Sequence, residues 1–176
     1  MPTIEAITPT ANGVFLVRDI CADSAEAQRQ AADAARIPGS RGGRLYGAAG
    51  AVLLIRCAHQ YSRPLVRIQT TDTGQHPLLP WQWEPPVSLD VPTGRICISA
   101  ADNDIAQPLT DIALEQGPGT YTVAFAHLGR TDLQDAAARV EAETLFSTSD
   151  ATTAAWKTLD GTEKYFIHLT RRRRLQ

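Results

Sequence analysis

The sequence predicts a mainly β protein, an antiparallel β-sandwich of about eight strands with one or two peripheral helices. Short apolar runs alternate with polar residues along most of the chain, which is typical of half-buried strands. Turn residues, mainly Gly and Pro, separate these runs. Only residues 23–36 and a segment that begins at Thr131 have the composition of helices.

Size and composition suit one soluble domain. The chain has 176 residues, of which 43% are hydrophobic and 20% charged. A chain of this length can bury roughly two-thirds of its unfolded surface without disulfides or metals. We expect residues 1–170 to form a single sandwich domain and residues 171–176 to form a basic C-terminal tail.

Cysteine usage and the start of the chain favour a cytoplasmic protein. Cys21, Cys57 and Cys97 are an odd number, and the opening residues lack the basic start and apolar run of a secretory signal. Cys57 and Cys97 lie in apolar runs, where thiols are commonly buried and inert. The longest apolar run, Ala48 to Ile55, is too short to span a bilayer, so no membrane role is expected.

The first elements are a short strand over 13–19 and a helix over 23–36. Asp23 and Glu26 have the spacing of a capping box, and alanine dominates the apolar face of this helix. The glycine-rich segment 39–44 lacks the Lys-Ser/Thr of a phosphate-binding loop and precedes a strand-like run, so we interpret it as a connector.

Four strands follow in two pairs. Residues 51–58 and 64–71 are separated by a turn over 61–63 and are interpreted as a hairpin. Residues 87–91 and 95–99 are separated by Pro92-Thr93-Gly94 and continue an antiparallel meander.

The last third predicts a strand, a helix and a closing strand. The turn 117–119 leads into an alternating run over 120–127, and a similar run occupies 164–170. Thr131 and Gln134 have capping-box spacing for the helix between them. Its apolar side is expected to contain Leu133, Ala137, Val140 and Leu145. Residues 147–153 are small and polar and are interpreted as a surface excursion.

Candidate chemistry is sparse, and we expect no cofactor, no metal and no catalytic residue. The sequence lacks a Gly-x-Ser-x-Gly elbow, a Cys-x-x-Cys pair and metal-ligand histidine spacing. Asp102-Asn103-Asp104 starts like a calcium loop but lacks the glycine and distal glutamate of that pattern. His127 and His168 occupy comparable ends of the closing strands, so an enzyme that uses them, or a sandwich that binds a small ligand, stays open.

Charge is distributed unevenly. The formal net charge is −2, but residues 171–174 contribute four arginines, which leaves 13 basic against 19 acidic residues, or −6, for residues 1–170. An acidic face is expected from Asp102, Asp104, Asp111 and Glu115, and acidic faces commonly meet basic partners. Trp81 and Trp83 alternate, so their rings point to one side and either close the end of the core or form a recognition patch.

The order of several segments resembles a known family. These segments are Trp83-x-x-Pro-Val-x-Leu-x-Val, Gly94-Arg-x-x-x-Ser, Gly117-Pro-Gly-Thr-Tyr-x-Val, Gly129-Arg and Glu163-Lys-Tyr-Phe-Ile-His-Leu. The pattern resembles small bacterial β-sandwich proteins similar to competence protein J, an inhibitor of a DNA-entry nuclease, and covers about residues 48–169. The resemblance implies a sandwich that works by protein–protein contact. It transfers no binding residue by motif.

These observations predict a non-enzymatic, protein-binding module, an immunity-type inhibitor that neutralises a basic toxin or nuclease. The acidic face would meet the partner's basic groove, with Trp81 and Trp83 as anchors. The alternative is a nucleic-acid-associated accessory protein that uses Arg171, Arg172, Arg173 and Arg174. The sequence leaves the oligomeric state open.

Overall fold

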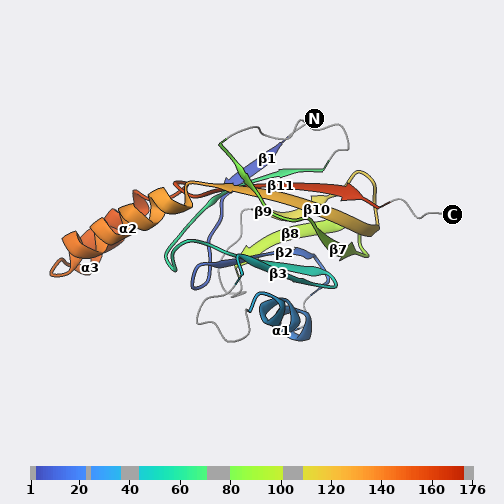
Figure 1. Cartoon of the computed structure of the whole chain (residues 1–176), viewed down its shortest axis with the longest axis horizontal. Coiled ribbons are helices and arrows are strands. Elements are labelled where there is room, and N and C mark those ends of the chain that lie inside the picture. Colours follow the sequence, from blue (N-terminus) through green and yellow to red (C-terminus); the bar gives the residue numbers. More distant parts are fainter. Residues whose placement is uncertain (1–2, 23–24, 37–43, 71–79, 101–108, 173–176) are drawn as a thin grey trace.

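The structure is a computed structural model that describes residues 3–22, 25–36, 44–70, 80–100 and 109–172. Two stacked sheets form its body, and three helices lie at the periphery (Figure 1). The predicted mainly β sandwich is confirmed, with eleven strands in the described residues rather than about eight. Residues 101–108 and 173–176, and with them Asp102, Asp104, Arg173 and Arg174, lie outside the described residues.

Sheet A has six strands. Its order is β1-β5-β11-β10, and β6 and β7 both pair with the remaining edge of β10. Its strands are β1 (Ile4–Ile7), β5 (Leu65–Gln69), β6 (Gln82–Trp83), β7 (Val87–Val91), β10 (Gly119–Leu128) and β11 (Lys164–Arg171). The pairing of β5 with β11 is parallel, whereas the other pairings of this sheet are antiparallel.

Sheet B is antiparallel throughout, with the order β3-β4-β2-β8-β9. Its strands are β2 (Val14–Asp19), β3 (Tyr46–Ala49), β4 (Val52–Arg56), β8 (Arg95–Ala100) and β9 (Leu109–Ala113). Aromatic and aliphatic side chains from both sheets fill the space between them, and Phe15 of β2 meets Tyr165 of β11 edge-on at 5.1 Å between ring centroids. This shared core holds the two sheets together.

Two predicted pairings are wrong. Strands β4 and β5 belong to different sheets, and so do β7 and β8, so the turns after Arg56 and Val91 cross between the sheets instead of forming hairpins. A strand with alternating apolar residues fits a hairpin within one sheet and a crossing between two sheets equally well, because in both cases one face of the strand points to the core. The choice is made by packing between segments far apart in the sequence.

The alanine-rich helix α1 (Ala25–Ala34) lies on the outer face of sheet B, as Figure 1 shows. Ala31 and Ala35 are buried against Leu16, Val52 and Leu54 in a small second core. Gly47 of β3 permits this close approach, because a Cβ at that position would collide with the carbonyl oxygen of Ala31. Small residues on both sides therefore set the distance between helix and sheet.

We predict that Gly47→Ala destabilises the fold by about 1–3 kcal/mol, since helix and strand must move apart to accept the methyl group. Urea denaturation measures the loss. Ala34→Ser on the exposed side of α1 is the control and should change stability by less than about 0.5 kcal/mol. Equal stability of the glycine and alanine forms would contradict the close contact.

Candidate protein-interaction surface

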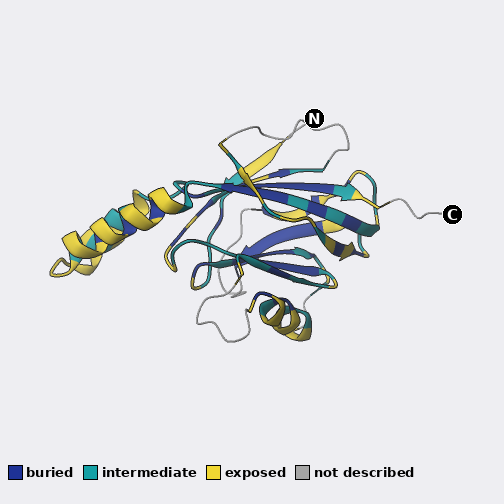
Figure 2. Cartoon of the chain, viewed as in Figure 1, coloured by how far each residue is buried: buried dark blue, intermediate teal, exposed yellow. Residues whose placement is uncertain are grey.

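A helical hairpin projects from one end of the sandwich. Helices α2 (Arg130–Thr144) and α3 (Ser149–Lys157) pack against each other and extend away from both sheets along the long axis of the molecule (Figure 1). We call this hairpin, residues 130–157, the arm. Most of its surface is exposed, whereas the strands next to it are mainly buried (Figure 2).

The arm begins at a glycine with left-handed backbone geometry. Gly129 caps α2 with φ 78°, and its carbonyl accepts the first helical hydrogen bond from the Leu133 amide at 2.9 Å. Its Cα lies so close to the carbonyl oxygen of Thr162 that a Cβ would not fit. The predicted capping by Thr131 is wrong, since Thr131 lies inside α2. The chain turns sharply out of β10 here, and only glycine satisfies both the φ angle and the close approach.

A buried carboxylate fixes the base of the arm. Glu163 is 1% exposed and accepts hydrogen bonds from the Ser62 hydroxyl at 2.7 Å and the Ala58 amide at 3.0 Å. It also accepts from the Tyr165 hydroxyl and from Nη1 of Arg130, both at 2.7 Å. The same Arg130 nitrogen donates to the carbonyl oxygen of Arg56 at 2.8 Å. The first residue of α2 is therefore bonded to both sheets.

Burial also affects the neighbours of this carboxylate. Desolvation, assisted by the negative charge of Glu163, raises the pKa of the Cys57 thiol well above its usual value. Desolvation is also the main cause that raises the pKa of the Tyr165 hydroxyl. Both groups therefore stay protonated at neutral pH, and neither is an activated nucleophile.

A second set of contacts holds α3. The ring of His59 stacks on Trp156 with centroids 4.9 Å apart, and Tyr61 meets the same indole edge-on at 4.9 Å. His59 Nε2 also lies 3.2 Å from a carboxylate oxygen of Glu141 on α2. Since His59 and Tyr61 belong to the segment that crosses from sheet B to sheet A, one loop of the sandwich contacts both helices of the arm.

The far end of the arm is apolar and exposed. Leu133, Ala137 and Val140 are buried along α2, but Leu145 is 71% exposed and Phe146 is 96% exposed at the turn between the helices. Leu145, which was expected on the apolar side of the helix, is thus not covered as the other three residues are. Burying a side chain of this type gains about 1.5–3 kcal/mol, which the monomer forgoes at the tip. We call Leu145 and Phe146 the tip.

The sequence interpretation missed the second helix of the arm. The segment taken as a surface excursion contains Thr148, which caps α3 by accepting a hydrogen bond from the Ala151 amide. Asp150 follows in the first helical turn. A capping threonine followed by an acidic residue and an alanine-rich run is a helix start signal, and it would have identified this hairpin.

The arm carries more acidic than basic residues. Residues 131–158 contain five acidic residues against two basic ones, a net charge of −3, which is half of the −6 carried by residues 1–170. Glu141 and Glu143 lie in the last turn of α2, which has no basic residue. This end of a helix carries the negative pole of the macrodipole, so each acidic residue costs about 0.3–1 kcal/mol compared with a favourable cation.

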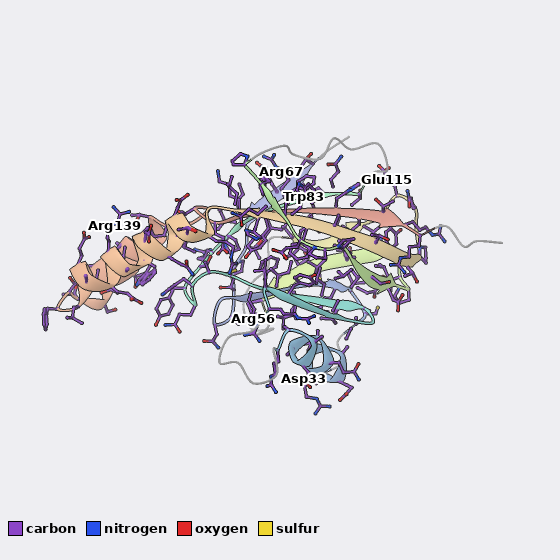
Figure 3. All side chains as sticks on the ribbon, in the orientation of Figure 1. Asp33, Arg56, Arg67, Trp83, Glu115 and Arg139 are labelled. Carbon is purple, nitrogen blue, oxygen red and sulfur yellow. The ribbon has the colours of Figure 1, made fainter. Side chains whose placement is uncertain are left out.

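The predicted acidic face lies elsewhere. Glu115 is exposed and lies near one end of the sandwich, whereas Arg139 marks the arm at the other end (Figure 3). Asp111 is exposed but pairs with the guanidinium of Arg95, which lowers the pKa of the Asp111 carboxyl through their hydrogen bonds. Arg95 thus offsets the charge of Asp111. The other two predicted members of the acidic face, Asp102 and Asp104, lie outside the described residues.

Trp81 and Trp83 lie on the outer face of sheet A. Both rings meet Phe166 edge-on, with centroid distances of 6.3 Å and 5.9 Å. Trp83 is 40% exposed and Trp81 is half-buried. They share one side, as the alternation predicted, but they do not belong to the core between the sheets.

Arg171 and Arg172 border a cavity of 1110 Å³. Strand β11, which ends at Arg171, runs away from the arm (Figure 1). Arg171 is the last residue of β11 and donates to the Gln116 carbonyl at 2.7 Å, and Arg172 donates to the Thr122 hydroxyl at 3.1 Å. Asp90 lines the same cavity. Protein groups thus already engage these two arginines, and a carboxylate lies beside them.

The two histidines considered for catalysis do not meet. His127 pairs in register with Tyr165, whereas His168 pairs with Ala124, so the imidazoles leave the sheet on opposite faces. His127 lies 3.1 Å from Glu84 instead. In the described part of the chain, no group of three or more His, Cys, Asp or Glu side chains is placed to hold a metal ion.

Buried carboxylates are also fully engaged. Asp19, which is 0% exposed, accepts from the Thr93 hydroxyl at 2.7 Å and from the amides of Thr93 and Cys21 at 2.9 Å and 2.8 Å. Together with Glu163 it has a structural role. Within the described ranges, no helix combines the length and apolar character needed to cross a membrane.

The molecule is thus a two-sheet sandwich with a helical arm at one end. No family model matches the chain, and no curated protein is detectably related to it in sequence. Its structure is similar to that of ComJ from Bacillus subtilis, an inhibitor of the DNA-degrading activity of NucA. The two are 10% identical, the TM-score is 0.48, and the match covers 98% of this chain and 96% of ComJ.

The structure is also similar to that of the protein of crocagin biosynthetic gene J. The two are 16% identical, the TM-score is 0.53, and the match covers 98% of both chains. The weak resemblance to competence protein J that the sequence predicted is confirmed, and the second likeness shows a shared fold.

We predict that Glu163→Gln lowers the free energy of unfolding by about 3 kcal/mol, because Arg130 then loses its buried counter-charge. Urea denaturation measures the loss. Glu141→Gln is the matched control, and it should cost less than about 1 kcal/mol because that carboxylate is exposed. Similar losses in the two variants would contradict the role assigned to the buried carboxylate.

A pH dependence follows from His127. Burial is the main cause that lowers the pKa of its imidazole, and it outweighs the hydrogen bond to Glu84, which raises the pKa. The unfolded chain titrates near about 6.5. Below that pH and down to the folded pKa, the unfolded state binds more protons, so stability falls as pH falls.

His127→Gln removes this titration, so we expect a smaller loss of stability than in the wild type between about pH 7 and about pH 5.5. Urea denaturation at the two pH values measures the slopes. Identical slopes for wild type and variant would show that His127 does not titrate differently in the two states.

Proposed function

We propose that this protein is a non-enzymatic protein-binding module that presents its arm to a partner. The observation that carries the proposal is Phe146, a large aromatic side chain 96% exposed at the end of a helical hairpin. Aromatic side chains that bury in a partner's pocket supply much of the binding energy of protein interfaces.

The anchoring of the arm supports this proposal. Hydrogen bonds that Arg130 donates hold the start of α2, and the stack of His59 on Trp156 holds the end of α3. A side chain presented on a preorganised element loses less entropy on binding than one on a flexible loop. The arm therefore offers the tip at low conformational cost.

The negative charge of the arm supports a more specific proposal, that the protein is an immunity-type inhibitor that blocks a toxin or nuclease. An enzyme that acts on nucleic acid has a basic substrate groove, and residues 131–158, with a net charge of −3, complement such a groove. The partner in this form is a basic protein, and the arm shields its groove from substrate.

The acidic face of Asp102, Asp104, Asp111 and Glu115, with Trp81 and Trp83, is a separate candidate contact surface. Glu115 lies at the other end of the molecule from the arm, so one small partner is not expected to cover both (Figure 3). The exposed tip, and the lack of an ion pair to Glu143 among the described residues, favour the arm over this face, where Arg95 pairs with Asp111.

We predict that replacing the tip by Leu145→Ser and Phe146→Ser weakens partner binding about tenfold or more. The thermal midpoint should change little, since both side chains are exposed. Affinity capture from the native host with tagged wild type and tagged variant, followed by titration of the captured protein, measures the loss.

Trp83→Ser is the matched control because it removes an exposed aromatic residue from the outer face of sheet A. Retained capture by this variant and loss by the tip variant support the arm. Loss with Trp83→Ser alone would transfer the contact to sheet A. A wild-type protein that captures no protein at all would refute a protein-binding role.

A further inference from the structure

We infer that the partner surface is an apolar pocket rimmed by lysine or arginine side chains, which receives Phe146 while its rim contacts Glu143 and Asp150. This inference rests on the proposed function and specifies the chemistry of the partner. It follows from the combination of an apolar tip and an acidic residue, Glu143, that forms no ion pair within the described residues.

The first step concerns Glu143. Its side chain lies in the last turn of α2 beside the negative pole of the helix, where a cation would be favourable. Among the described residues, none forms a hydrogen bond or ion pair with its carboxylate, although Arg139 lies one turn earlier on α2. Glu141 differs, because it contacts His59 and so helps to attach the arm to the sandwich. The folded monomer thus gains nothing visible from the charge of Glu143.

The second step concerns the end of α2. Leu145 occupies the C-cap with right-handed helical geometry, and Phe146 follows it into solvent. Helices usually end in glycine or a polar residue with left-handed geometry. Two large apolar residues and an unfavourable charge therefore coincide within four positions, and such violations of local rules concentrate at functional sites.

The third step concerns reach. Helix α2 has 15 residues, so its tip stands about 22 Å from its base. A hairpin of this length can enter a concave surface while the sandwich remains outside it. A pocket in a cleft fits this shape better than a flat surface does.

The charge near the tip distinguishes between three possible binding partners of the arm: a membrane, a second copy of this chain and a different protein. An anionic membrane would repel Glu143 and Asp150, which makes a lipid surface a poor match for the exposed phenylalanine. In a second copy of this chain, the exposed arginines Arg29, Arg67 and Arg95 are already paired with carboxylates of the same chain. A contact with Arg171 and Arg172 at the opposite end would be head-to-tail and would continue into rings or open chains. A partner with a basic pocket satisfies both the charge and the apolar tip without either difficulty.

The experiment starts from a chain with the photoreactive residue benzoylphenylalanine in place of Phe146. Irradiation in the native host should cross-link one protein, and the cross-linked peptide should lie in an apolar pocket flanked by lysine or arginine. The purified partner is then titrated with wild type, with Glu143→Lys and with the matched charge reversal Glu115→Lys.

We predict opposite effects of Glu143→Lys on stability and binding. The midpoint of thermal unfolding should rise by roughly 1 °C, because the gain from a cation at the end of α2 exceeds the repulsion from Arg139 one turn earlier. Partner affinity should fall about tenfold or more and lose part of its salt dependence. Glu115→Lys, which changes the net charge equally, should leave affinity within about twofold.

Each other outcome overturns a defined part of the argument. If a protein is cross-linked but Glu143→Lys binds it as well as wild type does, the basic rim is wrong while protein binding stands. If Glu115→Lys alone weakens binding, the sandwich end is the contact surface. Cross-linking to a second copy, or sedimentation with phosphatidylcholine–phosphatidylglycerol vesicles, would replace the inferred partner. If no protein is cross-linked and none is captured by wild type, the proposed function itself fails.

Discussion

The buried carboxylate of Glu163 is the interaction on which the arrangement of this molecule depends. Four donors surround it, from the β4–β5 crossing (Ala58 and Ser62), from β11 (Tyr165) and from α2 (Arg130). Desolvation of a charge is tolerated only when such donors compensate for it. The sheets and the arm thus meet at one negative charge, and the direction in which α2 leaves the sandwich is fixed there.

A buried ion pair of this kind is weak evidence for net stability, because an apolar cluster of the same volume is often as stable. Its distinctive property is geometric. The hydrogen bonds of Arg130 to Glu163 and to the Arg56 carbonyl define one orientation of the first turn of α2, whereas apolar contacts would tolerate several. The aromatic stack of His59 on Trp156 adds a second attachment point on α3. Two separate attachments resist both bending and rotation of the arm.

The alternation of apolar residues was enough to predict the sandwich but not its connections. Val123 and Phe125 point inward as expected, and β10 pairs with β11. The hairpin predicted between β4 and β5 failed because residues 57–64 carry the chain from one sheet to the other to reach Glu163. The segments 129–130 and 163–169 were singled out by the resemblance, but the sequence did not show that their charged residues form a pair.

The arm shows why the candidate site escaped the sequence. Leu145 continues the apolar face of α2, so helical periodicity places it in a core, but α2 extends beyond the sheets and no core exists there. Periodicity identifies which face of a helix is apolar and says nothing about what covers it. The same limit applies to a strand. The sequence predicted that the rings of Trp81 and Trp83 point to one side, but it did not show that this side faces away from the core.

The two ends of α2 obey opposite rules. At its base, the buried carboxylate of Glu163 has Arg130 as its partner, and Gly129 supplies the one backbone conformation that the turn requires. At its tip, an apolar pair is exposed and Glu143 stands at the unfavourable pole of the helix. A sequence shaped by folding alone would favour a lysine and a polar turn at this end. The base holds the arm in one orientation, so the fold itself does not require these residues at the tip. Contacts with a partner explain best why two exposed apolar residues and an unfavourable charge occur there.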